Sequence, residues 1–208
     1  MNIKEIKQEL VAHSPLTALG AFSGLALLLI MLATKISGAT SLNLFEFAHP
    51  LHVFLSAFAT IATFRRAHGM GFWKTVLIGY LGSVGICTIS DCVIPYLSEW
   101  ILGFPNRGFH FCFIEDWWIV NPIAFVGTWL GVVLSKTKLP HAFHVFVSTW
   151  ASLFHITSSM TTSPSVFYIF AIGFFLFISV LIPCCTSDII FPLFFVECKN
   201  REKCGHKH

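Results

Sequence analysis

The stretch that decides the fold is His49-Pro-Leu-His52-Val-Phe-Leu-Ser56-Ala-Phe-Ala59, because it occurs a second time as His141-Ala-Phe-His144-Val-Phe-Val-Ser148-Thr-Trp-Ala151. The two copies align without a gap at an offset of 92 residues. In each copy, His and Ser recur every three or four positions within an otherwise apolar segment. Residues at that spacing share one face of an α-helix, so each copy predicts an apolar helix with a polar stripe.

Two further matches flank this stretch in the same order. Residues 87–95, CTISDCVIP, match residues 184–192, CCTSDIIFP, at an offset of 97. Ser14-Pro15 followed by Gly20 and Gly24 matches Asn121-Pro122 followed by Gly127 and Gly131, at an offset of 107. Three matches in one order indicate a duplicated unit. The glycines four residues apart are typical of closely packed helices.

Composition identifies lipid as the solvent for most of the chain. Of its 208 residues, 55% are hydrophobic and 11% are charged, whereas a soluble domain carries about 25% charged residues. A membrane span needs roughly 20 apolar residues, so six spans with short loops use the whole chain. We therefore predict an all-α membrane protein whose six transmembrane helices lie near residues 15–34, 50–64, 75–97, 118–135, 141–160 and 165–195.

Each duplicated unit holds three spans, and an odd number makes the second copy enter the membrane from the opposite side. Such inverted-topology repeats are typical of secondary transporters. We expect residues 1–100 to form the first three-helix repeat and residues 118–198 the second. Residues 101–117 would form an outer connecting loop, and residues 199–208 a cytoplasmic tail.

The charges predict the orientation and exclude one class of partner. Of the 13 Lys and Arg residues, all but Lys35 and Arg107 fall on one side of the predicted spans, which places both termini in the cytoplasm by the positive-inside rule. The N-terminal residues 1–16 have no signal-peptide pattern and predict a short amphipathic helix on the membrane surface. These features favour a prokaryotic inner membrane. A net charge of +3 without a basic, aromatic-rich run gives no indication of nucleic-acid binding. The lipid bilayer is the expected partner, and the sequence is also compatible with a homo-oligomer.

Two carboxylates stand within the predicted spans, Asp91 and Asp188. A charge in the membrane is costly unless it has a partner, and the predicted spans contain no Lys or Arg. Pro95 and Pro192 follow four residues later and have no N–H for the carbonyl of the aspartate, so we interpret both prolines as helix-breaking. Each locus then offers a carboxylate, a bare carbonyl and the hydroxyl of a preceding serine. The alternatives are a protonated Asp bonded within the bundle and an Asp that reaches water at a span end.

Combining these elements predicts two metal sites, one toward each face of the membrane. The outer site would contain His49, His52 and Asp91, and the inner site His141, His144 and Asp188. The side chains expected to line the path between them are Ser56, Ser90, Ser148, Ser187 and His155. If the His and Asp groups of both halves meet at one point, the two sites become a single midplane site. Weaker candidates are His13 for the inner site, and Glu115, Asp116 and Asn121 for the outer one.

Imidazole with carboxylate and hydroxyl suits Zn, Mn, Fe, Co or Ni better than Na or K. The leading hypothesis is therefore a small transporter or channel for a divalent transition metal. One alternative is a haem-binding electron carrier resembling a membrane cytochrome b, with histidines as axial ligands. Another is an intramembrane metalloenzyme, although the chain has no G-x-S-x-G or H-E-x-x-H motif. The remaining alternative is a scaffold in which the polar groups only hold helices together.

Overall fold

In a computed structural model of the chain, the structure describes residues 3–67, 72–134, 139–161 and 164–185, and the regular elements of these residues are all helical. The predicted all-α class is confirmed. The long helices are α1 (Ile3–Ala33), α2 (Gly38–Ala67), α7 (Trp117–Val133), α8 (Leu139–Ser158) and α9 (Val166–Cys185). A further continuous rod runs from Phe72 to Leu102 through α3 (Phe72–Tyr80), η1 (Leu81–Gly85), α4 (Ile86–Thr88), η2 (Ile89–Val93) and α5 (Ile94–Leu102). The short α6 spans Cys112–Glu115.

Four of these segments are long and apolar enough to cross a membrane: His13–Ala33, Gly38–Ala62, Phe72–Leu102 and Val166–Pro183. They indicate an integral membrane protein in contact with lipid. The second segment begins at Gly38, not at the predicted residue 50. Ser37 caps this helix, since its hydroxyl accepts the backbone N–H of Thr40 at 3.1 Å. The polar residues before His49 thus belong to the helix.

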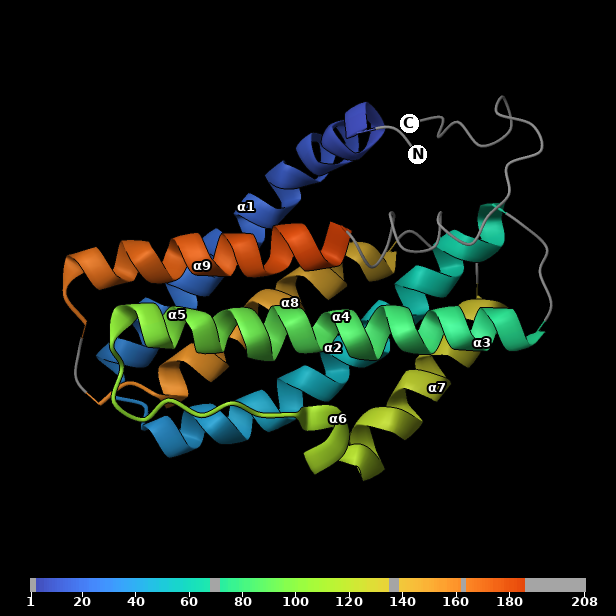
Figure 1. Cartoon of the computed structure of the whole chain (residues 1–208). Coiled ribbons are helices and arrows are strands. Elements are labelled where there is room, and N and C mark those ends of the chain that lie inside the picture. Colours follow the sequence, from blue (N-terminus) through green and yellow to red (C-terminus); the bar gives the residue numbers. More distant parts are fainter. Residues whose placement is uncertain (1–2, 68–71, 135–138, 162–163, 186–208) are drawn as a thin grey trace.

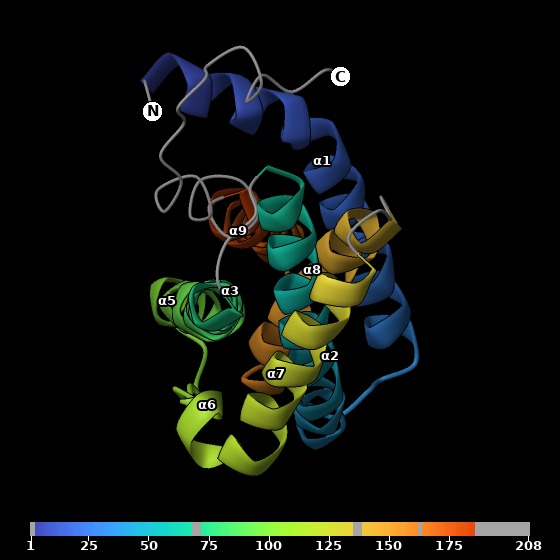
Figure 2. The ribbon, with the colours of Figure 1, turned by 90° about the vertical axis from the view of Figure 1, so that its right-hand side faces the viewer.

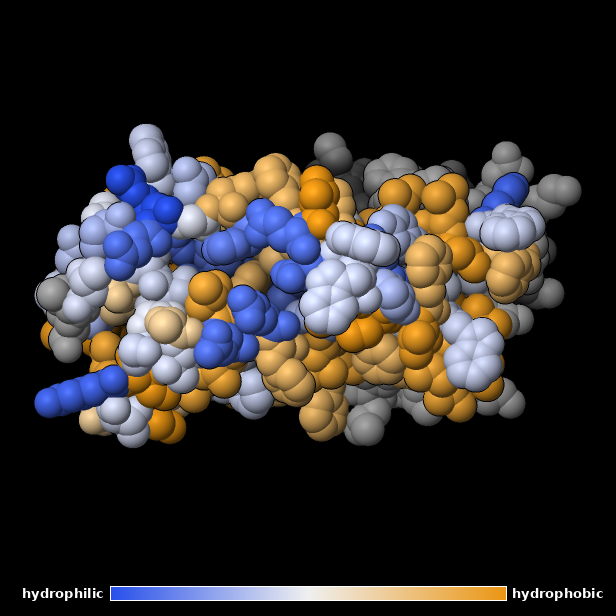
Figure 3. Space-filling model, turned by 90° about the horizontal axis from the view of Figure 1, so that it is seen from below, coloured by the Kyte–Doolittle hydropathy of each residue, from blue (hydrophilic) through white to orange (hydrophobic). Residues whose placement is uncertain are grey.

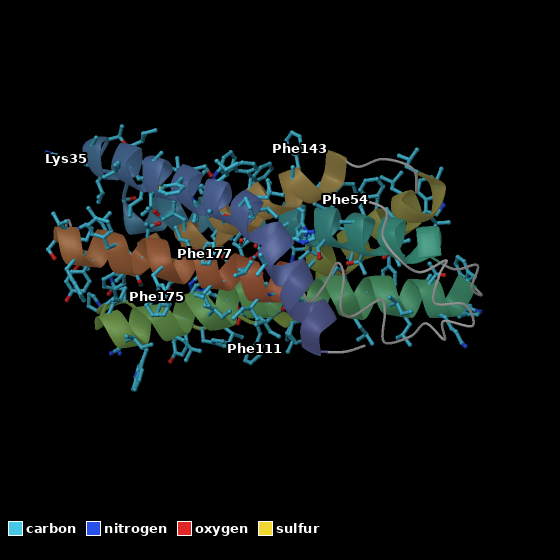
Figure 4. The ribbon with its side chains drawn as sticks, turned by 90° about the horizontal axis from the view of Figure 1, so that it is seen from above. Lys35, Phe54, Phe111, Phe143, Phe175 and Phe177 are labelled. Atoms are coloured by element: carbon cyan, nitrogen blue, oxygen red, sulfur yellow. The ribbon has the colours of Figure 1, made fainter. Side chains whose placement is uncertain are left out.

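Helix α2 lies at the centre of the bundle and packs mainly on α7 and α8, whereas α1 packs on α8 and α9 (Figures 1 and 2). One hydrophobic core extends across both halves of the chain, from Leu28 of α1 to Leu176 of α9. Aromatic side chains such as Phe111 and Phe143 project outward, and Lys35 lies at one end of the bundle (Figure 4). At that end α1 and α5 finish and α2 and α9 begin. We call it the α5 end.

The two glycine pairs that the sequence analysis singled out lie at close contacts between helices. A Cβ atom on Gly127 would lie 2.5 Å from the carbonyl oxygen of Phe54, and one on Gly131 would lie 2.8 Å from that of Phe58. The absence of side chains therefore brings α7 directly against the backbone of α2. Gly20 and Gly24 of α1 meet Thr149 of α8 in the same way: Cβ atoms there would lie 2.9 and 2.8 Å from its side chain.

The rod from Phe72 to Leu102 contains two π-helical turns, η1 and η2. Pro95 lies in the first turn of α5, directly after η2, and the rod continues past it. The sequence predicts a break of the helix at Pro95, whereas the structure has a widened turn, η2, just before this proline. The rod ends at Gly103, whose φ of 71° allows the Phe104 N–H to reach the Glu99 carbonyl at 3.0 Å, as in a Schellman cap.

Two segments depart from the long axis of the bundle. The first turns of α1 bend away across the other end of the bundle (Figure 2), and Pro15 inside this helix supplies the cause. The residues expected to form a short surface helix thus form the first turns of α1. Residues 103–111 run back along the bundle from the α5 end to α6 (Figure 1). This return delivers Cys112 to the interior of the bundle, where it is 2% exposed.

Candidate metal centre

Asp91 is the hub of a buried polar cluster between α2, α8 and the π-helical rod. Its Oδ2 atom accepts the Nδ1–H of His49 at 2.9 Å and that of His52 at 2.7 Å. Its Oδ1 atom accepts the hydroxyl of Ser90 at 2.7 Å. All four side chains are at most 2% exposed. Both oxygens of the carboxylate are therefore occupied, and each histidine turns its Nε2 atom away from Asp91.

The first group of possible metal ligands contains His49. Its other members are Cys92 and Cys112, and the three ligand atoms all lie within 4.8 Å of one another. The two sulfur atoms are 3.6 Å apart, and the buried Nε2 atom of His49 has no hydrogen-bond partner. With its proton on Nδ1, the imidazole presents a lone pair on Nε2, which is the form that binds metals. We call this group the first triad.

The second group contains His52, Cys87 and His144, and their ligand atoms also lie within 4.8 Å of one another. The Nε2 atom of His52 is 3.7 Å from the sulfur of Cys87. The rings of His52 and His144 stack with centroids 4.6 Å apart. We call this group the second triad. Asp91 thus supports one histidine of each triad.

The π-helical turn explains why Cys87, Asp91 and Cys92 face one centre. In an α-helix, residues five positions apart diverge by about 140° around the axis. The i→i+5 bonding of a π-turn brings such residues closer to one face, and π-bulges are frequent at functional sites. In η2, Ile94 N–H donates to the Ile89 carbonyl, which is this i→i+5 pattern. Asp91 and Cys92 both lie in that turn.

Hydroxyl groups hold the wide turn in place from the neighbouring helices. Ser152 of α8 donates its hydroxyl to the backbone carbonyl of Ser90 at 3.0 Å. Ser179 of α9 donates in turn to Ser152 at 3.3 Å. Ser90 also donates to the carbonyl of Cys87 at 3.0 Å. These bonds satisfy backbone groups that lipid could not and fix the position of Asp91.

A second carboxylate–histidine pair lies nearer the α5 end. Oε1 of Glu99 accepts the Nδ1–H of His155 at 2.7 Å, and both side chains are 1% exposed. Oε2 of Glu99 and Nε2 of His155 are buried without a hydrogen-bond partner. Phe45 separates this pair from the first triad, since its ring stacks on His49 at 5.5 Å and meets His155 edge-on at 5.0 Å.

The structure brings together four of the six predicted ligands: His49, His52, Asp91 and His144. His52 and His144, expected in separate outer and inner sites, are direct neighbours. His141 belongs to α8, but its side chain lies outside the described residues. Asp188, Ser187 and Pro192 also lie outside them. Of the other predicted path residues, Ser56 and Ser148 are fully buried, Ser90 bonds to Asp91, and His155 bonds to Glu99.

Among the described residues, neither triad includes the weaker candidates. His13 lies in α1, where its carbonyl accepts the hydroxyl of Thr17. Asn121 accepts the hydroxyl of Tyr80 at 3.0 Å and so ties α7 to α3. The carbonyl of Asp116 accepts the backbone N–H groups of Ile119 and Val120, which begins α7. Glu115 bonds to His110 in the segment that precedes α7.

Four residues of these groups are absent from the predicted ligand set, namely Cys87, Cys92, Cys112 and Glu99. A signal existed for two of the cysteines, since Cys87 and Cys92 flank Asp91 within one to four residues. Glu99 follows Asp91 at eight residues, on the same broad face of a helix, but it lies beyond residue 97, where the predicted span ends. Cys112 carried no signal, because only the return of residues 103–111 brings it to the cluster.

Comparison of the chain with protein-family models, with curated proteins and with solved structures finds no match. The geometry of the cluster is therefore the basis on which a function can be assigned to the chain.

Proposed function

We propose that this chain is a small membrane transporter that carries a divalent transition-metal cation through a paired centre inside its helical bundle. One observation carries the proposal: a single oxygen of Asp91 supports His49 and His52, each of which belongs to its own buried His/Cys triad. A carboxylate behind a ligating imidazole is the usual outer-shell support of a metal site, since it fixes the tautomer and raises the basicity of the ring.

The charges of the cluster favour two divalent ions. When metal binds, the three thiols of the two triads would lose their protons. Three thiolates and the Asp91 carboxylate carry four negative charges, which equal the charge of two divalent cations. Two monovalent cations would leave two negative charges uncompensated in a buried site, at a large desolvation cost.

The ligand types narrow the metal further. Thiolate and imidazole together suit Zn, Co, Ni or Fe, whereas Mn prefers oxygen ligands. Each triad supplies three ligands and leaves one tetrahedral position open. Structural zinc sites are closed by four protein ligands, so an open position suits an ion that must enter and leave.

The packing of the two halves supports the inverted repeat. The glycine pair that begins each half contacts the second helix of the other half: α1 meets α8, and α7 meets α2. His52 and His144, which occupy equivalent positions of the repeat, stack on each other. In this proposal six helices span the membrane with both termini in the cytoplasm of a prokaryotic cell, and the α5 end faces outward.

The haem alternative fits this geometry less well. Axial histidines direct one ring nitrogen of each imidazole at the iron from opposite sides of the porphyrin. The faces of His52 and His144 are in direct contact, with an interplanar angle of 29°, and this leaves no place for a porphyrin between them.

The test combines metal content with flux. Purified chain loaded with Zn²⁺ should hold two ions in the centre, and proteoliposomes with an internal zinc-sensitive dye should show zinc entry. Asp91→Asn should reduce both metal content and entry. Glu46→Gln is the matched control, because it removes an exposed carboxylate of α2 and should change neither. Two bound ions without zinc entry would overturn the transporter, and wild-type metal content in Asp91→Asn would overturn the centre itself.

A further inference from the structure

The Glu99–His155 pair is the one buried acid–base pair of the described residues that the proposed centre does not use. Each partner keeps one buried atom without a hydrogen bond, Oε2 of Glu99 and Nε2 of His155. An unsatisfied buried polar group costs about 1–3 kcal/mol, and more when it is charged. Two such atoms on neighbouring side chains are available to bind a ligand.

A second imidazole stands beside this pair. The ring of His110 lies 5.7 Å from that of His155 and 6.4 Å from that of Phe45. His110 is 34% exposed, and its Nδ1 atom lies 3.2 Å from the carboxylate of Glu115, which is 49% exposed. The two residues therefore connect the buried pair with the surface.

The surface itself is polar at this place. On the face seen from below, hydrophilic side chains form a band from the α5 end to the middle of the molecule, over the part where residues 103–116 lie (Figure 3). Apolar side chains cover much of the middle of that face and of the part farther from the α5 end. A cation that approaches along this band would meet carboxylates and imidazoles before any thiol.

We propose that Glu99, His155 and His110 form a second cation site, free of sulfur, which captures a divalent transition metal at the α5 end. Oxygen and imidazole nitrogen are ligands for Zn, Co, Ni, Mn or Fe. The site binds more weakly than the thiolate triads, since sulfur ligands are the ones that favour zinc. An ion released past Phe45 would reach His49, and this transfer step rests on the proposed function, whereas the binding itself does not.

Cobalt distinguishes the two kinds of site. The probe is Co²⁺, titrated into the purified full chain, which is prepared through a tag without histidine. Thiolate-bound cobalt shows intense near-ultraviolet charge-transfer absorption, whereas cobalt on oxygen and nitrogen ligands shows only weak visible bands. Wild-type chain should bind two ions with charge transfer and at least one more ion without it.

The variant Glu99→Gln decides the proposal. It keeps the size of the side chain and one acceptor oxygen for His155, so the bundle should fold, as a thermal melt would verify. Bound cobalt should fall by one ion while the charge-transfer absorption stays at the wild-type level, and Glu46→Gln should bind the full amount. The same amount of cobalt in Glu99→Gln and in the wild type overturns this site. If the wild type with cobalt shows no charge-transfer bands, the proposed thiolate centre is overturned instead. The failure of the second site and the failure of the proposed centre therefore give different results.

Discussion

Asp91 and Glu99 stand on the same helical rod, and both accept a hydrogen bond from a buried histidine, yet their surroundings differ. Asp91 has every oxygen engaged, by two imidazoles and one hydroxyl, and thiols surround its histidines. Glu99 has one oxygen engaged and one left without a partner. The first carboxylate orients ligands for a metal, whereas the second has a free oxygen with which to bind one directly.

The largest expected effect comes from the thiols, because they separate the two regions chemically. Cys87→Ser removes a ligand of the second triad only, and Cys92→Ser one of the first triad only. Each single variant should hold one zinc ion in the centre instead of two, and the double variant none. Elemental analysis after desalting measures this.

Zinc entry into proteoliposomes should be abolished in the double cysteine variant. The control is Cys204→Ser in the C-terminal tail, which removes a thiol outside both triads. Two ions retained by the double variant would place the centre elsewhere.

Oxidation should distinguish the two regions next. The sulfur atoms of Cys92 and Cys112 lie 3.6 Å apart, so a small movement would bring them to the bonding distance of about 2.05 Å. Hydrogen peroxide should convert the two thiols of metal-free chain to a disulfide, with release of two water molecules. Mass spectrometry of peptides should detect the cross-link, and the first triad should then no longer bind zinc.

Bound zinc should protect this thiol pair, because it holds both sulfur atoms as thiolates on the metal. The cobalt signal that depends on Glu99 should survive the same oxidation, since that site has no sulfur. Equal cross-linking with and without zinc would argue against metal ligation by Cys92 and Cys112.

A change in packing should affect the two regions unequally. Gly127→Ala places a methyl group 2.5 Å from the Phe54 carbonyl oxygen and should push α7 away from α2, which carries His49 and His52. Overpacking of this kind costs about 1–3 kcal/mol, which corresponds to a fall in Tm of roughly 2–12 °C for a chain of this size. Zinc in the thiolate centre should weaken more than cobalt at Glu99, because the Glu99 pair lies between α5 and α8.

Gly85→Ala is the matched control for this packing change. A Cβ atom there would meet nothing within 4 Å, and the backbone of Gly85 is right-handed helical. Its Tm should equal or exceed that of the wild type, since alanine favours helix. A similar loss in both variants would mean that helix contact at Gly127 is not what destabilises the bundle.

The smallest expected effect concerns Ser90, whose hydroxyl donates a hydrogen bond to Oδ1 of Asp91. Ser90→Ala leaves both histidine bonds in place and frees one carboxylate oxygen, so Asp91 comes to resemble Glu99. Zinc affinity should fall, but less than in Asp91→Asn, for which outer-shell loss predicts a decrease of about 10–100-fold. Competition with a zinc chelator of known affinity measures the difference. An affinity as low as in Asp91→Asn would show that the hydroxyl matters as much as the carboxylate charge.

Some residues of the cluster could be predicted from the sequence, and others could not, because their position depends on the path of the chain in space. Hydropathy and the repeat predict helical rods, and His49, His52 and Asp91 follow from their spacing and from the cost of polar groups in lipid. Cys92 joins them only because a π-turn widens the rod, and no composition rule locates such a turn. Cys112 depends on the path of a loop, and Glu99 depends on a rod that extends to Leu102 where the prediction ended at residue 97.

The two π-helical turns have a consequence for how such a chain can change. A π-turn accommodates one residue more than an α-helical turn, so a helix can absorb one extra amino acid there without breaking. Removing one residue from Ile89–Val93 would turn η2 into an ordinary α-helical turn, and the rod beyond it would keep its phase, with Glu99 still directed at His155. The π-turn thus lets the stretch around Asp91 gain or lose one residue while Glu99, one region away, keeps its direction.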